Sequence, residues 1–255
     1  MTDMTVEQTH AAVRDRYGSI ARGGGSCCGP TGCGTSSQSL GYTPEELAKV
    51  PAGADLSLGC GNPRAIADLQ PGETVLDLGS GPGLDCFLAA QAVGPTGHVI
   101  GVDMTPDMLA RARDNARAIA SKNVEFRLGT IEHLPVANDS VDVVISNCVV
   151  NLSPDKRSVF AETYRVLKSG GRVAIADMVA TAPLPPEARA DLEAYTGCVA
   201  GAAEIGVLEA LLVEVGFVDV RVRPMDESRE MVREWMPGSR LADYVLSATL
   251  EARKP

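Results

Sequence analysis

The stretch that decides the fold is V-L-D-L-G-S-G-P-G, residues 75–83. Its apolar first half is typical of a buried strand, and its glycines allow the backbone to approach a ligand closely. We expect a helix directly after it, so that a ligand would lie against a helix N-terminus. Further along, V-I-G-V-D ends at Asp103, where an acid can bind both hydroxyls of a ribose.

Apolar runs recur along the rest of the chain, with helical patterns between them. We expect strands at residues 74–78, 98–102, 124–128, 141–146, 172–177, 218–223 and 244–249. We expect helices over residues 3–17, 153–168 and 204–215, with further ones beginning at Thr43 and Thr105. This alternation predicts an α/β fold with a Rossmann-like, doubly wound and mostly parallel sheet.

We expect three parts along the chain. Residues 1–69 hold N-terminal helices and a cysteine-containing segment at 18–41, whose Gly- and Ser-rich composition predicts a mobile loop. Residues 70–179 form the expected Rossmann core. Residues 180–255 add a small helical segment, expected to bind the substrate, and the last strands of the sheet.

The composition excludes several classes of partner. The 255 residues carry a net charge of −10 and only 4% aromatic residues, which disfavours a nucleic-acid substrate. The polar N-terminus lacks a signal core, and no apolar run reaches the ~20 residues that span a bilayer. We therefore expect a cytoplasmic protein without membrane contact. Its seven cysteines, an odd number, argue against a structural disulfide framework.

Three details separate the glycine loop from that of a dinucleotide-binding or purely structural Rossmann domain. The spacing is D-x-G-x-G-x-G, Asp77 would repel a pyrophosphate but suit an α-amino group, and the third strand is followed by G-T-I-E-H-L-P. Together they resemble class I S-adenosylmethionine (SAM)-dependent methyltransferases. The resemblance implies contacts to the methionine, ribose and adenine parts of SAM. The predicted cofactor site comprises Asp77, Gly79, Ser80, Gly81, Gly83, Asp103, Met104, Ile131, Glu132 and Asn147.

The cysteines point to a thiophilic ligand, because thiolates are soft donors. Cys148 follows the fourth expected strand, at the sheet edge where open α/β sheets bind ligands. Cys60 and Cys198 lie in glycine-flanked segments that we expect outside the core. Cys86 lies in the helix after the glycine loop, and we expect its side chain to pack in the core.

A second cysteine group, C-C-x4-C, lies near the N-terminus and consists of Cys27, Cys28 and Cys33. A zinc knot would need a fourth ligand, and no histidine or C-x2-C pair lies nearby. These thiols stay available for metal, metalloid or redox chemistry.

The motifs around these cysteines resemble arsenite SAM methyltransferases. They are Y-G at Tyr17, C-C at Cys28, G-C-G-N-P at Cys60, S-N-C-V-V-N-L at Cys148, and a cysteine-containing helix near Cys198. The resemblance implies that Cys148 and Cys198 hold trivalent arsenic and that Cys60 is the third thiolate. It also implies a disulfide between Cys60 and an N-terminal cysteine. Cys27, Cys28 and Cys33 all stay candidates for this role, and Cys28 is the one included in the predicted site.

The implied activity is methyl transfer from SAM to arsenite and methylarsenite, which serves arsenic detoxification. A thiol reductant such as thioredoxin or glutathione would restore the cysteines. Two alternatives stay open: a class I methyltransferase acting on a small organic acceptor, and a metalloid-binding protein without catalysis. The intact glycine loop and Asp103 argue against the second alternative, since a pure binder has no use for them.

Overall fold

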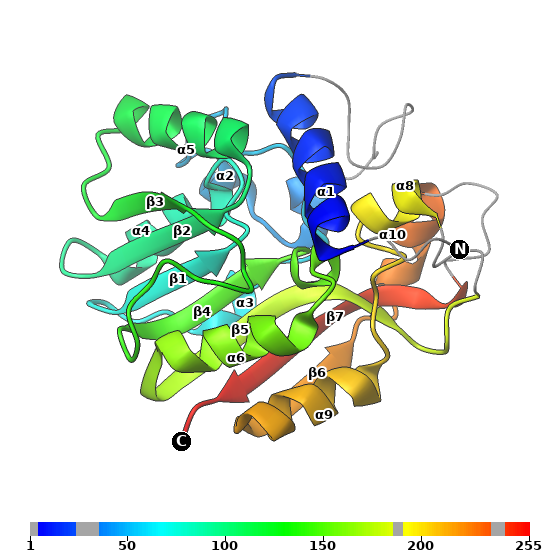
Figure 1. The fold of residues 1–255 in the computed structure, drawn as a ribbon. Helices are drawn as coiled ribbons and strands as arrows, with labels where there is room; N and C mark the ends of the chain where they lie inside the picture. The colour runs from blue at the N-terminus through cyan, green and yellow to red at the C-terminus, as the bar shows by residue number, and fades with distance from the viewer. Residues whose placement is uncertain (1–4, 24–35, 186–190, 236–242) are drawn as a thin grey trace.

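The computed structural model describes residues 5–23, 36–185, 191–235 and 243–255. Within them, a seven-stranded sheet in the order β3-β2-β1-β4-β5-β7-β6 forms the centre (Figure 1). The first five strands pair in parallel, and β7 runs antiparallel to β5 and β6, which confirms the expected fold class. The strands are β1 (Thr74–Leu78), β2 (His98–Asp103), β3 (Val124–Leu128), β4 (Val141–Asn147), β5 (Leu167–Ala180), β6 (Val218–Pro224) and β7 (Val245–Arg253).

Helices cover both faces of the sheet. Helices α4 and α5 pack with the α2–α3 segment on one face, and α6 and α9 cover the other. Helices α1, α8 and α10 gather near the carboxyl ends of the parallel strands (Figure 1). The helices are α1 (Val6–Ala21), α2 (Pro44–Leu47), α3 (Arg64–Ala67), α4 (Leu84–Val93), α5 (Pro106–Ala118), α6 (Lys156–Val166), α8 (Leu192–Thr196), α9 (Ile205–Val215) and α10 (Ser228–Trp235), with 3-10 turns η1 (Ser37–Leu40) and η2 (Val150–Leu152).

Helix α1 is longer than the sequence predicts. It begins with a capping box, in which the Thr5 hydroxyl accepts from Gln8 N and the Gln8 side chain accepts from Thr5 N. It continues to Ala21, so residues 18–21 are helical and not part of a loop. Packing on α5 explains the extension, because the Arg111 guanidinium donates to the Ala21 carbonyl at 3.0 Å. Residues 24–35 of the expected mobile loop, which include Cys27, Cys28 and Cys33, lie outside the described residues, whereas Ser37–Leu40 form the 3-10 turn η1.

The boundary between α6 and β5 also differs from the expected helix over 153–168. The helix ends at Val166, and Leu167 already pairs with Val141 in the sheet. Gly170 N then donates to the Lys254 carbonyl at 2.9 Å, which draws the two glycines into the extended strand. Tertiary pairing thus overrides the glycine stop signal on which the prediction depended.

The strand order places the ligand site. Strand β1 lies between β2 and β4. Strands β2 and β3 are added on one side of β1, and β4 and β5 on the other, so the strand order reverses between β1 and β4. Loops that follow these two strands diverge and leave a crevice at the carboxyl edge of the sheet. None of the described helices combines the length and apolar character that crossing a bilayer requires.

We expect Phe160→Ala to lower the free energy of unfolding by about 3–5 kcal/mol, because it empties a fully packed site between α6 and the sheet. Phe160 is 0% exposed in the larger apolar cluster. Urea denaturation followed by circular dichroism measures the change. Val213→Ala, at a helical position that is 60% exposed, is the control and should change stability by no more than about 0.5 kcal/mol. Equal losses in both variants would contradict this packing.

Candidate active site

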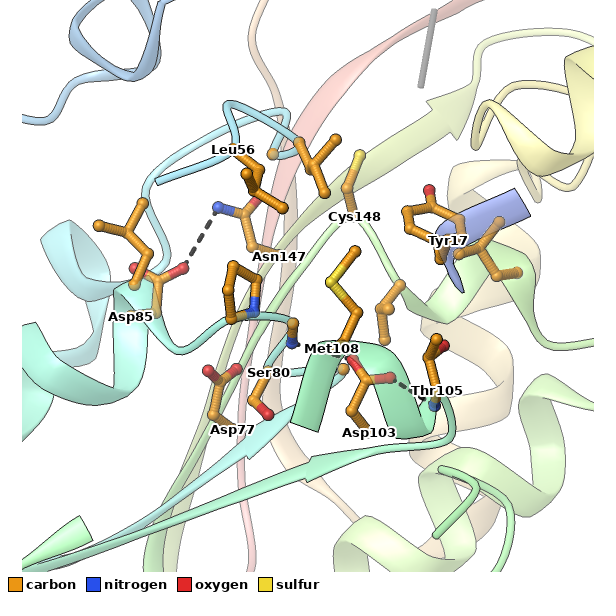
Figure 2. A pocket seen from close by; sticks show the side chains of 18 of the residues that line it. Tyr17, Leu56, Asp77, Ser80, Asp85, Asp103, Thr105, Met108, Asn147 and Cys148 are labelled. Carbon is orange, nitrogen blue, oxygen red and sulfur yellow. Dashed lines mark hydrogen bonds between the residues drawn. The ribbon is translucent and has the colours of Figure 1, made fainter. Parts of the chain in front are cut away.

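A cavity opens at the carboxyl edge of the sheet, above β1 and β4 (Figure 2). Gly83 of the predicted cofactor site does not line it; this residue is the N-cap of α4, where an added Cβ would lie 2.8 Å from Phe87 and 2.9 Å from Phe126. A side chain at this position would therefore disturb the packing around the start of α4. The other nine predicted residues do line the cavity: Asp77, Gly79, Ser80, Gly81, Asp103, Met104, Ile131, Glu132 and Asn147.

Asp103 joins the loops after β1 and β2. One carboxylate oxygen accepts from Gly81 N at 2.9 Å, and the other accepts from Thr105 N at 2.8 Å. Burial raises the pKa of Asp103 above its usual value, while these two N–H donors oppose the rise. A carboxylate has about four acceptor positions, so Asp103 can still accept hydrogen bonds from ribose hydroxyls beside these donors.

A second acidic group lies at the opposite end of the cavity and consists of Asp77 and Asp85. Burial, reinforced by the charge of Asp85, raises the pKa of Asp77 well above its usual range, and burial also raises the pKa of Asp85. Cys86 is fully buried, as expected, and its Sγ donates to Asp77 at 3.2 Å. Two buried carboxylates favour a cationic group between them, such as an ammonium. Sequence reasoning missed Asp85, although its place in the first turn after the glycine loop is a usable signal.

Helix α1 closes the cavity on the side of Glu132. His10 Nε2 lies 3.0 Å from a Glu132 carboxylate oxygen, and the Ser153 hydroxyl donates to the same oxygen. His10, Val13 and Tyr17 of α1 all line the cavity. These three residues were not predicted as site residues, because nothing in the local sequence indicates that α1 reaches a loop more than a hundred positions away.

The three candidate arsenic-binding cysteines come from separate segments and meet at one place. Cys60, Cys148 and Cys198 are 1%, 5% and 4% exposed, within one apolar cluster that also holds Trp235. The expectation that Cys60 and Cys198 lie outside the core is therefore wrong. Their flanking glycines mark close packing, since a Cβ on Gly61 would lie 2.8 Å from the Ala176 side chain.

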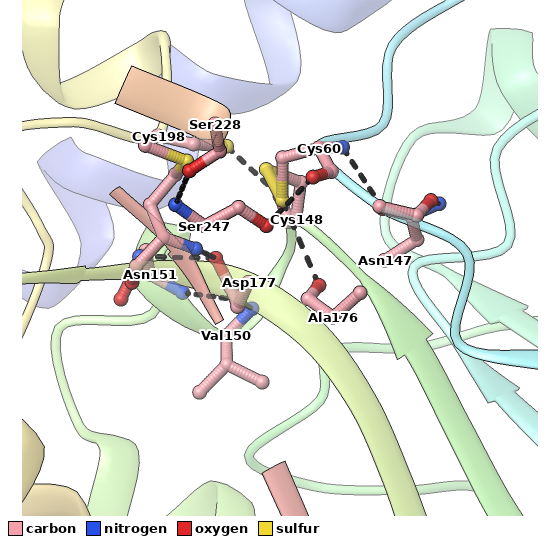
Figure 3. The surroundings of a disulfide bond; sticks show 12 residues. Cys60, Asn147, Cys148, Val150, Asn151, Ala176, Asp177, Cys198, Ser228 and Ser247 are labelled. Carbon is pink, nitrogen blue, oxygen red and sulfur yellow. Dashed lines mark hydrogen bonds between the residues drawn. A yellow bond between two sulfur atoms is a disulfide. The ribbon is translucent and has the colours of Figure 1, made fainter. Parts of the chain in front are cut away.

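Cys60 and Cys148 are joined in a disulfide (Figure 3). This pairing differs from the predicted one between Cys60 and an N-terminal cysteine, and Cys28 itself lies outside the described residues. The reason is spatial: the Cys60 loop lies directly over the turn after β4, although 88 positions separate the two cysteines. The sequence argues against structural disulfides from the odd number of cysteines and the expected compartment. Neither property indicates which cysteines lie close together in the folded chain.

Cys198 lies against the same turn without joining the bond. Its Sγ donates to the Cys148 carbonyl at 2.8 Å. Both Cys148 and Cys198 have left-handed backbone conformations, with φ of 59° and 64°. Such conformations are unfavourable for residues with a Cβ and cluster at functional sites, where the surrounding structure holds them.

Asn147 links the cysteines to the cavity. It lines the cavity, and its Oδ1 accepts from Cys60 N at 3.0 Å while its Nδ2 donates to the Gly61 carbonyl at 2.8 Å. The sequence predicts Asn147 as a cofactor residue. In the structure, the side-chain amide also holds the Cys60 loop beside Cys148.

Asp177 lies beneath the cysteines. Its carboxylate accepts from Val150 N at 2.8 Å, from Met178 N at 2.7 Å and from the Asn151 side chain at 3.0 Å. Burial raises the pKa of Asp177 to about 6. One of its oxygens and the two bonded sulfurs all lie within 4.8 Å of one another. Sequence reasoning missed Asp177, although it ends an expected strand at the same sheet edge.

Comparison with known proteins places this chain in a family. A family model described as "Methyltransferase domain" matches residues 69–236. The arsenite methyltransferase of Halobacterium salinarum is 54% identical over the whole of this chain, which covers 69% of that protein. The chain belongs to the arsenite methyltransferase family. A second arsenite methyltransferase, from Aquipseudomonas alcaligenes, is 39% identical over 84% of this chain, which covers 63% of that protein.

A solved structure of the same family has a similar fold. CrArsM, an arsenic(III) S-adenosylmethionine methyltransferase from Chlamydomonas reinhardtii, superposes with a TM-score of 0.65 and is 34% identical. The match covers 86% of this chain and 73% of that one. The chain thus spans about two thirds of the length of the two curated arsenite methyltransferases and has the class I methyltransferase fold.

We expect Gly81→Ala to weaken SAM binding by at least about tenfold, because the new methyl group would enter the space that the cofactor needs. Gly81 lines the cavity with φ of +51°, and a Cβ there meets no protein atom within 4 Å. Isothermal titration calorimetry measures the affinity. The matched control is Gly94→Ala, a position with φ of +68° and equally open surroundings that does not line the cavity. SAM affinity equal in the two variants would contradict a cofactor at the glycine loop.

Proposed function

We propose that this chain transfers the methyl group of SAM to trivalent arsenic held by Cys60, Cys148 and Cys198. The observation that carries the proposal is the meeting of these three cysteines at the wall of the cofactor cavity. Cys148 itself lines the cavity, and the other two lie against its turn. Thiolates at this position suit a thiophilic acceptor better than an organic one.

Arsenite binding exchanges oxygen for sulfur on arsenic. Arsenite is a neutral trihydroxide near neutral pH, and each thiol replaces one hydroxyl as its proton leaves with that hydroxyl as water. The product is a pyramidal arsenic with three As–S bonds and a lone pair that points away from the sulfurs. The apolar surroundings of the cysteines, which include Trp235 and Met178, favour this loss of polar groups.

Methyl transfer is then an in-line displacement. The arsenic lone pair attacks the methyl carbon, the carbon–sulfur bond of the sulfonium breaks, and S-adenosylhomocysteine leaves. Asp77 and Asp85 would hold the ammonium of the donor, and Asp103 its ribose, which fixes the methyl group relative to Cys148. Positioning of this kind can lower the barrier by ~7–11 kcal/mol. No general base is needed, because arsenic loses no proton in this step.

The transfer oxidises arsenic by two electrons, so turnover needs two thiols to return it to the trivalent state. We propose that Cys60 and Cys148 supply these electrons: their two bonds to arsenic break as the disulfide between them forms. The methylated arsenic, trivalent again, keeps its bond to Cys198 and takes hydroxide from a water molecule, which releases a proton. Exchange with Cys28 would then move the bond to Cys60 and Cys28 and free Cys148, while Cys60 becomes available for the next arsenic only after this second disulfide is reduced. Thioredoxin or glutathione would reduce the final disulfide, so repeated turnover requires a thiol reductant as well as SAM.

We expect purified protein, SAM, arsenite and a thiol reductant to yield methylated arsenic, and Cys148→Ser and Cys198→Ser to yield none. Each replacement removes one of the sulfur donors, and a serine oxygen binds arsenic too weakly to replace it. Separation of the arsenic species with detection by mass spectrometry measures the product. Cys86→Ser is the matched control: this buried thiol lies in the other apolar cluster, and a serine hydroxyl can replace its hydrogen bond to Asp77, so turnover should stay measurable.

Three results would overturn or redirect the proposal. Full activity in both Cys148→Ser and Cys198→Ser would exclude the thiolate site. Bound arsenite without methyl transfer would favour a metalloid-binding protein, and the absence of both would favour an organic acceptor.

Omission of the reductant should stop the reaction after one turnover or fewer, because the disulfide between Cys60 and Cys148 occupies two of the three sulfur donors.

A further inference from the structure

Helix α1 is held firmly against the cofactor half of the site. His10 near its start lies 3.0 Å from Glu132, and the Ala21 carbonyl at its end accepts from Arg111 at 3.0 Å. Arg22, directly after the helix, forms an ion pair with Asp107 of α5. Residues in the middle of α1 are therefore fixed in position relative to the cavity.

One of these middle residues reaches the arsenic half of the site. The Tyr17 hydroxyl donates to the Thr196 carbonyl at 3.3 Å and lies 3.7 Å from Cys198 Sγ. Tyr17 and Cys148 both lie on the wall of the cavity (Figure 2). Tyr17 is thus a hydroxyl-bearing residue of the cofactor half that contacts a sulfur of the thiol half.

We propose that Tyr17 is a positioning residue, whose hydroxyl orients the Cys198 sulfur for arsenic; this inference rests on the proposed function. As a thiol, Cys198 donates its proton to the Cys148 carbonyl at 2.8 Å. That hydrogen bond is lost when arsenic binds, because the thiol proton leaves with an arsenite hydroxyl as water. The Tyr17 hydrogen can then rotate from the Thr196 carbonyl to the sulfur, since both lie within reach of one hydroxyl.

The three sulfurs are therefore held in position by different parts of the structure. Cys60 and Cys148 are close enough to bond to each other, so their sulfurs are placed by the Cys60 loop and the turn after β4. Cys198 comes from a separate segment after α8, and its sulfur needs its own restraint once the thiol hydrogen bond is gone. Tyr17 provides that restraint and joins the third sulfur donor to the helix that covers the cofactor.

The test compares arsenite binding by reduced wild type, Tyr17→Phe and Tyr195→Phe. Trp235, the only tryptophan of the chain, belongs to the same apolar cluster as the three cysteines, so its fluorescence can follow arsenite binding. We expect Tyr17→Phe to raise the Kd for arsenite by about three- to tenfold, the cost of one hydrogen bond between uncharged groups. Its SAM affinity, measured by calorimetry, should fall less than its arsenite affinity, because phenylalanine keeps the ring with which Tyr17 lines the cavity.

Tyr195→Phe is the matched control. Its hydroxyl donates to the Leu152 carbonyl at 3.1 Å, so the variant removes from α8 a phenol hydroxyl that bonds a backbone carbonyl instead of a sulfur. Arsenite should bind to it as to wild type. Equal weakening in both variants would mean that the phenols act only by stabilising this segment, and the proposal would be wrong.

A double variant tests whether Tyr17 acts through Cys198. Tyr17→Phe should weaken arsenite binding in the wild-type background and add no further loss in the Cys198→Ser background. An additive loss, or a fall in SAM affinity as large as that for arsenite, would contradict the assignment. Failure of wild type itself to bind arsenite would instead overturn the proposed function, so the two failures are distinguishable.

Discussion

The turn at the carboxyl end of β4 determines where both reactants can lie. Strand β4 pairs in parallel with β1 and β5, so its end is restrained on both sides. Cys148 N donates to the Ala176 carbonyl of β5 at 2.8 Å, and the Asn147 amide holds the Cys60 loop. Because the sheet fixes this turn, the cavity after β1 and the cysteines stay next to each other.

The two sides of this turn differ in chemistry. On the cofactor side, Asp77, Asp85 and Asp103 are buried and raised in pKa, which favours a ligand that brings positive charge. On the other side, the cysteines lie in an apolar cluster that favours a neutral, thiophilic ligand. A cationic methyl donor and a neutral arsenic acceptor match these two environments, with Cys148 at the boundary between them.

Much of this arrangement follows from local sequence patterns. The bounds of β1 and β3 agree with the expected strands at 74–78 and 124–128, because short apolar runs and flanking turn residues specify buried strands. The glycine loop and Asp103 likewise have local spacing that indicates a cofactor site. The early start of β5 could not be predicted, since it depends on pairing with Val141 and Lys254.

Contacts between distant segments could not be predicted either, because local sequence patterns do not show which segments pack together. Glycines beside Cys60 suggest an exposed loop, whereas in three dimensions they admit close packing. The bond between Cys60 and Cys148, and the approach of Tyr17 to Cys198, depend on how the Cys60 loop and α1 pack over the sheet edge. The resemblance to a family indicated which cysteines form the site, but which of them pair depends on the three-dimensional packing of these segments.

X-ray absorption at the arsenic edge tests the central claim most directly. Reduced protein is loaded with arsenite, and the atoms bonded to arsenic are identified from the spectrum. This account predicts three sulfur neighbours and no oxygen, with one sulfur replaced by oxygen in Cys198→Ser. Retained oxygen neighbours in the wild type, or a spectrum unchanged by that substitution, would contradict a site built from Cys60, Cys148 and Cys198.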